Sequence, residues 1–212
     1  MTLVEKARSK GMPVAIHTIG DAALELALSA LEAYPVRNGR DRLIHVQVIR
    51  PELIERIKKL NVILDLQPRF VAADFPWVRE RLGLERMPYA FAWKTLLNHD
   101  LRCAGGSDAP IEPADPLLGI HAAVTRQKPE GDGEVFGAEQ RLTVHEAVQL
   151  FTTGSAFAIG KEHTRGKIAV GYVADFTVLD QNLFHIPPER ILSTNVLMTV
   201  VDNTIMYDAI KG

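Results

Sequence analysis

The sequence predicts an α/β fold in which parallel strands alternate with helices. Short apolar runs recur along the first half of the chain, and amphipathic stretches separate them. The apolar runs are nearly continuous, which is typical of strands in a parallel sheet covered by helices. The composition, 47% hydrophobic and 24% charged over 212 residues, is that of an ordinary globular protein with a sizeable core.

Four strands and three helices are predicted in the first half of the chain. Gly20-Asp21 offers an N-cap for a helix from Ala22 to about Ala33, whose apolar residues recur at helical spacing. Pro51 is a good first-turn residue for the second helix, and the third lies around residues 91–98. The predicted strands cover residues 13–17, 43–47, 62–66 and 101–104.

In the second half of the chain, the sequence pattern changes from alternating strands and helices to β structure. Residues 127–140 resemble a surface loop, and Thr143 and Glu146 form a capping box for a helix that runs to about Phe151. Residues 175–180 and 196–207 are rich in strand-forming residues, and Asp202-Asn203 indicates a hairpin turn. We therefore predict two domains, residues 1–165 and a small β segment at 166–212.

Charge and composition exclude several classes of protein. The 24 basic and 26 acidic residues give a net charge of −2 without long like-charge runs, so neither nucleic acid nor a membrane surface is an expected partner. The single Cys103, expected to be a buried inert thiol, excludes an internal disulfide and a cysteine-based zinc site. No membrane span or signal peptide is recognisable, so we expect a soluble, cytoplasmic protein.

Three polar residues end or follow predicted strands: His17, His45 and Asp108. In parallel α/β folds, functional sites are built at the carboxyl ends of the strands. Two imidazoles and a carboxylate form a recurrent catalytic metal set that leaves a coordination position for water. The alternative is that each histidine is a hydrogen-bonded structural residue. Gln67 and Arg69 follow the third strand and are further candidates for lining the pocket mouth.

Four ordered motifs carry a resemblance to a known family. They are residues 15–21 (AIHTIGD), 105–110 (GGSDAP), 115–126 (DPLLGIHAAVTR) and 171–180 (GYVADFTVLD). Together they resemble the C-terminal half of the amidohydrolase superfamily, in the branch that includes N-substituted formamide deformylases.

The resemblance implies a metal-dependent (β/α)8 barrel, of which this chain would supply about strands 5–8, together with a small C-terminal β domain. His17 and His45 would bind a divalent metal, with zinc as the expected ion. Asp108 would touch the metal and act as the catalytic residue that relays a proton from water. The substrate would be a small molecule with an amide- or formamide-like carbon–nitrogen bond.

The sequence departs from the family in three respects, of which the first is that Asp202-Asn203 replaces a hairpin turn that is usually Gly-rich. Ile44 stands where relatives usually have an acidic residue before the histidine. No two of the seven histidines are separated by one residue, so the first-strand His-X-His pair of the family is not found. We therefore expect half a barrel with two open strand edges, which two copies could pair. The alternative to an enzyme is a truncated, non-catalytic fragment or an oligomerising remnant.

A different enzyme class is suggested by Gly105-Gly-Ser-Asp-Ala109, which is close to the nucleophile elbow of serine hydrolases. Ser107 would then be the nucleophile. An elbow must lead directly into a helix, whereas Pro110 and the segment to Asp115 do not favour one. This alternative is therefore the weaker one.

Overall fold

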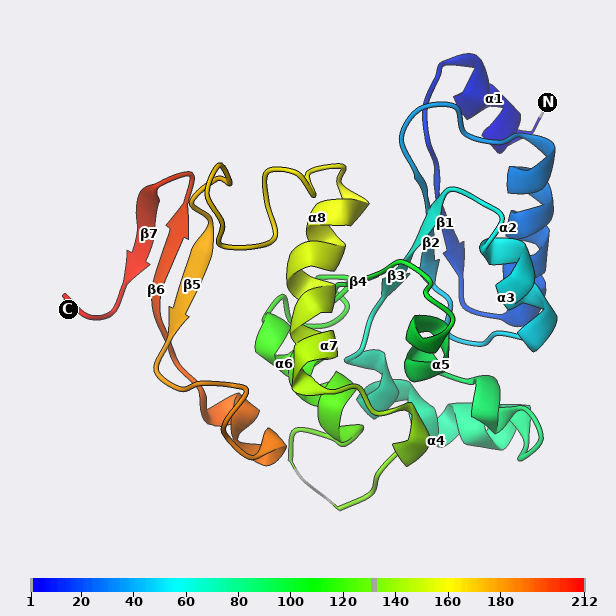
Figure 1. Ribbon diagram of the computed structural model, residues 1–212. Helices are drawn as coiled ribbons and strands as arrows, with labels where there is room; N and C mark the ends of the chain where they lie inside the picture. Colours follow the sequence, from blue (N-terminus) through cyan, green and yellow to red (C-terminus); the bar gives the residue numbers. More distant parts are fainter. Residues whose placement is uncertain (1, 131–132, 212) are drawn as a thin grey trace.

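The computed structural model describes residues 2–130 and 133–211, and within these residues the strands form two sheets (Figure 1). The first sheet has four parallel strands in the order β1-β2-β3-β4. Its strands are β1 (Ala15–Thr18), β2 (Asp41–His45), β3 (Val62–Leu66) and β4 (Cys103–Gly105). The predicted mixed α/β fold with a parallel sheet is confirmed, and all four strands end at the same edge of the sheet.

Helices connect and cover these strands. Their bounds are α1 (Leu3–Ser9), α2 (Asp21–Ala33), α3 (Pro51–Ile57), α4 (Phe70–Leu82), α5 (Trp93–Asn98), α6 (Pro116–Thr125), α7 (Val144–Gln149) and α8 (Ser155–Ala158). A π-helical turn, η3 (Leu150–Gly154), joins α7 to α8, and 3-10 turns lie at η1 (Met87–Tyr89), η2 (Ala138–Gln140) and η4 (Pro188–Ser193). In the described part of the chain, no helix has both the length and the apolarity needed to cross a membrane.

Local sequence signals explain where several helices begin. Pro51 is the first residue of α3, and Thr143 and Glu146 form the predicted capping box of α7. Among the helices that were not predicted are α1 and α4. The first, α1, has its own capping box between Thr2 and Glu5, a signal that was present in the sequence. The second, α4, contains Pro76 and lacks a clear apolar stripe, so its pattern is weak.

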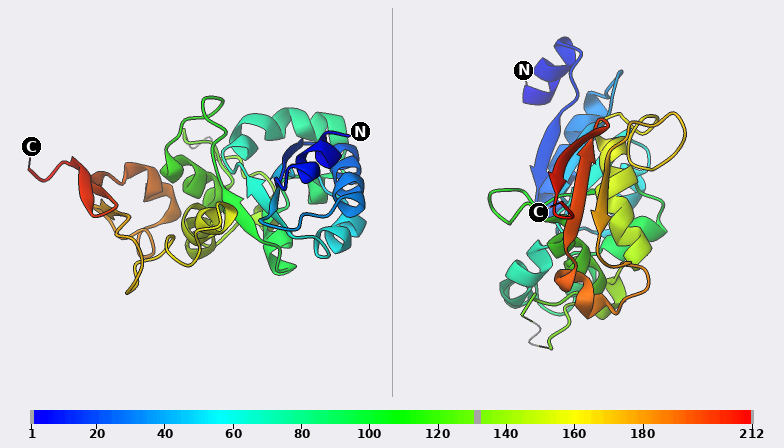
Figure 2. Two further views of the ribbon diagram at one scale, coloured as in Figure 1. Left: turned by 90° about the horizontal axis from the view of Figure 1, so that it is seen from above. Right: turned by 90° about the vertical axis from the view of Figure 1, so that its left-hand side faces the viewer.

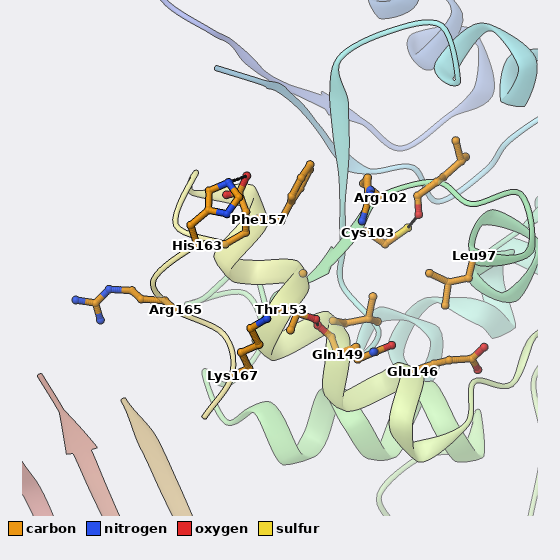
Figure 3. A pocket seen from close by; sticks show the side chains of 14 residues that line it. Leu97, Arg102, Cys103, Glu146, Gln149, Thr153, Phe157, His163, Arg165 and Lys167 are labelled. Carbon is orange, nitrogen blue, oxygen red and sulfur yellow. Dashed lines mark hydrogen bonds and ion pairs between the residues drawn. The ribbon is translucent and has the colours of Figure 1, made fainter. Parts of the chain in front are cut away.

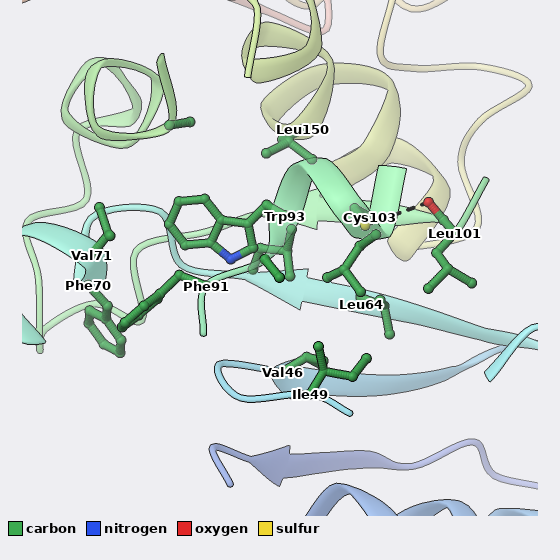
Figure 4. Packing of buried hydrophobic residues seen from close by; sticks show 14 of the residues in the cluster. Val46, Ile49, Leu64, Phe70, Val71, Phe91, Trp93, Leu101, Cys103 and Leu150 are labelled. Carbon is green, nitrogen blue, oxygen red and sulfur yellow. Dashed lines mark hydrogen bonds between the residues drawn. The ribbon is translucent and has the colours of Figure 1, made fainter. Parts of the chain in front are cut away.

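The core lies between the parallel sheet and its helices (Figure 4). Leu64 of β3 is fully buried and belongs to the same cluster as Trp93 of α5 and Leu150 of η3. Cys103 of β4 is buried among the same residues, as predicted for an inert thiol. Burial of large apolar side chains in β2 and β3 keeps the sheet in register, and this register aligns the strand ends that carry the polar residues.

The second sheet is antiparallel and consists of β5 (Phe176–Leu179), β6 (Val196–Val201) and β7 (Thr204–Asp208). Asp202 and Asn203 join β6 to β7 with φ of 49° and 62°, which confirms the predicted hairpin turn. Helices α6, α7 and α8 lie between the two sheets (Figure 2). The predicted domain boundary after residue 165 falls between α8 and β5 and stays a prediction.

The expectation of two open sheet edges needs a correction at β4. The Arg102 carbonyl accepts from Leu64 of β3, so the next carbonyl, that of Cys103, points to the other side. There the η3–α8 helix covers the strand: a Cβ on Gly154 would lie 2.3 Å from the Cys103 carbonyl oxygen. The Ser155 hydroxyl, which donates to the Leu150 carbonyl at 2.9 Å, also lies 3.4 Å from the Gly105 carbonyl oxygen. Helix packing therefore shields the edge of β4.

Candidate active site

The structure brings the three predicted site residues together at the carboxyl ends of the strands. His17 lies in β1, His45 is the last residue of β2, and Asp108 lies in the loop that follows β4. The ring centroids of His17 and His45 are 4.5 Å apart, with their planes at 77°. His45 Nε2 is 3.9 Å from Asp108 Oδ2. The parallel register accounts for this meeting, because all four strands end at the same edge of the sheet: β1 and β2 are neighbours, and Asp108 reaches His45 from the loop after β4, two strands away.

The surroundings of His45 favour a neutral imidazole. His45 is only 5% exposed. Its ring stacks on Phe70, the first residue of α4, with the ring centroids 5.6 Å apart. Burial, together with the neighbouring His17, lowers the pKa of His45. A neutral imidazole is the form that binds a metal. Phe70 was not among the predicted site residues, and the signal available in the sequence was its place four residues after the end of the third strand.

The backbone is unusual at the same residues. His45, Val46 and Asp108 have φ of 74°, 46° and 59°, in the left-handed region that side-chain-bearing residues rarely adopt. Val46 is β-branched, which makes this conformation more costly. Such backbone strain clusters at functional sites because the surrounding structure must hold it. It also explains why β2 ends at His45, two residues before the predicted end.

A cleft of about 380 Å³ adjoins Asp108. Gln67 lines this cleft, while Arg69 instead pairs with Glu112 at 3.1 Å and ties the loop after β3 to the loop after β4. Deeper along the strands, Arg42 forms an ion pair with Asp65, and burial raises the pKa of the Asp65 carboxyl. The cleft residues are Arg42, Ile44, Asp65, Gln67, Ala104, Gly105, Gly106, Asp108, Ser155, Ala158 and Ile159.

The donor chemistry of the site fits a divalent metal. His45 Nε2 faces the half-exposed Asp108 carboxylate at 3.9 Å, and the other ring nitrogen, Nδ1, is buried and has no hydrogen-bond partner among the described residues. Imidazole nitrogens and a carboxylate oxygen suit zinc and other first-row ions. Across residues 2–130 and 133–211, however, no group of three or more His, Cys, Asp or Glu side chains is arranged so that it could hold a metal ion.

A separate hollow of about 680 Å³ lies between α5, the start of β4 and the α7–α8 region (Figure 3). Its lining includes Arg102, Cys103 and Glu146 and none of the three predicted site residues. Burial raises the pKa of the Cys103 thiol to about 12, so this thiol is no nucleophile. The hollow is therefore not the site that the sequence predicted.

The geometry around Ser107 does not resemble a nucleophile elbow. Residues after Ser107 form turns, and the next helix, α6, begins only at Pro116 with Asp115 as its N-cap. An elbow serine sits directly between a strand and a helix.

Comparisons with known proteins agree with this architecture. The profile of the Amidohydrolase family matches residues 2–207. The protein YtcJ of Bacillus subtilis (strain 168) is 54% identical over 208 residues, which cover 97% of this chain and 39% of YtcJ. The N-substituted formamide deformylase of Arthrobacter pascens is 26% identical over 219 residues, which cover 97% of this chain and 38% of the deformylase.

A solved structure shares the fold as well as the sequence. The crystal structure of an uncharacterized metal-dependent hydrolase from Pyrococcus horikoshii OT3 superposes with a TM-score of 0.75 at 36% identity. The match covers 87% of this chain and 37% of the Pyrococcus chain. The chain thus spans about two fifths of the length of the relatives that it matches.

Proposed function

Because the chain belongs to the amidohydrolase family, we propose that it is a metal-dependent hydrolase that cleaves carbon–nitrogen bonds of small amide- or formamide-like molecules. The observation that carries the proposal is the meeting of His17, His45 and Asp108 at one edge of the parallel sheet. The relative named as a formamide deformylase and the neighbour named as a metal-dependent hydrolase support it.

The proposal includes the architecture of the site. The four parallel strands are proposed to correspond to strands 5–8 of a (β/α)8 barrel, with residues 166–212 as part of a small β domain. Two observations support this: the strands pair in sequence order, and every strand is followed by a helical connection on the way to the next. A barrel places its active site at the carboxyl ends of its strands, where the three residues lie.

In this proposal His17, His45 and Asp108 hold a divalent metal, with zinc as the proposed ion. When bound, such an ion acts as a Lewis acid that polarises the substrate carbonyl and acidifies water. The Asp108 carboxylate, half-exposed beside His45, accepts the proton of the attacking water and returns it to the leaving nitrogen. Phe70 fixes the plane of the His45 ring, so that the imidazole keeps its direction.

The test compares the wild-type chain with Asp108→Asn. Elemental analysis of freshly purified protein should find about one metal per chain or per pair of chains, and less in the variant. Hydrolysis of simple N-substituted formamides should fall about 100-fold or more in the variant. Asp115→Asn is the matched control, because Asp115 caps α6 through the Leu117 amide and asparagine caps equally well. Absence of metal in the wild type, even after zinc incubation, would contradict the proposal.

A second candidate function is self-association without catalysis, as expected for an oligomerising remnant. The observation that favours it is the outer edge of β1, which in the described residues pairs only with β2. Unpaired strand edges add strands from other chains. Sedimentation velocity at high micromolar concentration should then show a dimer, and a strictly monomeric protein would exclude this pairing.

A further inference from the structure

A buried arginine at the end of α6 has no part in the proposed chemistry. Arg126 is 0% exposed and lies in the left-handed cap of the helix, with φ of 60°. Its guanidinium donates from Nε to the Phe136 carbonyl at 2.6 Å and from Nη1 to the Phe91 carbonyl at 2.9 Å. It also lies 4.7 Å from the centroid of the Trp93 ring. Burying a guanidinium is costly, so such contacts call for a reason.

Phe91, whose carbonyl accepts from Arg126, belongs to a segment that is hydrogen-bonded to the residues following His45. The Phe91 amide donates to the Gln47 carbonyl at 2.7 Å, and the Ile49 amide donates to the Tyr89 carbonyl at 3.0 Å. Between these bonds, Val48 and Ala90 form an antiparallel bridge. Residues 89–91, which include the Arg126-bound carbonyl, therefore pair with residues 47–49 as a short antiparallel segment.

Residues 47–49 in turn hold the backbone at His45. Both His45 and Val46 are left-handed, a conformation that persists only where neighbouring contacts impose it. The Val48 amide adds one such contact by donating to the Ile19 carbonyl at 2.9 Å. The Phe91 and Trp93 side chains also line the same small hollow as the His45 ring. Both the backbone and the ring of His45 are thus linked to the segment under Arg126.

We propose that Arg126 is a positioning residue that holds His45 in its site through the backbones of Phe91 and Gln47. The consequence of this positioning for metal binding rests on the proposed function, whereas the effect of Arg126 on the His45 backbone does not. A planar guanidinium suits this task because it reaches two carbonyls from different loops at once. Lysine has a point charge on a flexible stem and would hold one of them.

The test replaces Arg126 by methionine, which keeps an unbranched stem without donors, and by lysine. Leu28→Ala is the control, because it truncates a fully buried side chain of α2 and leaves residues 47–49, residues 89–91 and Arg126 unchanged. Hydrogen exchange at the amides of Ile49 and Phe91 reports whether residues 47–49 and 89–91 stay paired, and this measurement needs no metal. Titration calorimetry with Zn²⁺ alone reports the consequence for the site.

We expect Arg126→Met to speed exchange at these amides at least tenfold relative to the β3 amides, and to weaken Zn²⁺ binding about tenfold. Arg126→Lys should give intermediate values, and it decides the question if the methionine variant does not fold. Unchanged exchange at Ile49 and Phe91, or the same acceleration in Leu28→Ala, would overturn the proposal. A wild-type chain that binds no Zn²⁺ would refute the proposed function, while the exchange comparison would still decide the positioning role.

Discussion

Gly154 permits the contact between the η3–α8 helix and strand β4, and its substitution by alanine is the sharpest test of this packing. A Cβ at residue 154 would lie 2.3 Å from the Cys103 carbonyl oxygen and 3.1 Å from the Gln149 carbonyl oxygen. Both obstacles are backbone atoms, which cannot rotate away. To lengthen the first contact from 2.3 to 3.0 Å, helix and strand must separate by at least 0.7 Å.

The expected loss of stability follows from two opposing effects. Overpacking a close contact costs about 1–3 kcal/mol, and a backbone obstacle places Gly154→Ala at the upper end of that range. Alanine in place of glycine inside a helix recovers about 1 kcal/mol. The free energy of unfolding should therefore fall by about 2 kcal/mol, which for a chain of this length lowers Tm by roughly 4–8 °C.

Gly119→Ala is the matched comparison, since it makes the same change inside α6. There the new Cβ would lie 2.4 Å from Cζ of Phe151, which is the far end of a half-buried side chain and not a backbone atom. Its loss, after the same helical gain, should stay below about 1 kcal/mol. Urea unfolding followed by circular dichroism measures both variants. A Gly154→Ala chain as stable as the wild type, or more stable than Gly119→Ala, would refute the packing described for β4.

Two further predictions concern buried ionisable groups. Burial and the nearby Arg69 lower the pKa of His121, so the unfolded chain takes up a proton first as pH falls below about 6.5, and stability falls with it. His121→Gln should reduce that fall between pH 7.5 and 5.5, measured by urea midpoints; an unchanged slope would contradict the assignment. The Cys103 thiol, with its pKa of about 12, should react with a disulfide reagent only after denaturation, and fast labelling of the native chain would count against its burial.

Much of the fold could be predicted from local sequence patterns. The apolar run at Val62–Leu66 matches β3 residue for residue, and the capping box at Thr143 and the turn at Asp202-Asn203 lie where their chemistry requires. These features depend on side chains close in sequence, which is why single-sequence reasoning reaches them. Helix α4 escaped prediction because Pro76 interrupts a weakly amphipathic segment whose helix is stabilised by tertiary packing.

The candidate site likewise has features that could be predicted from the sequence and features that depend on the tertiary structure. The sequence by itself determined that His17, His45 and Asp108 end or follow strand-like segments, and strand alternation implied a common edge. Only the tertiary structure decided their separations, the left-handed turn at His45, the stacking of Phe70 and the reach of Arg126 across three segments. The physical reason is that strand patterns record which residues are buried, whereas contacts between distant loops depend on how the whole sheet and its helices pack.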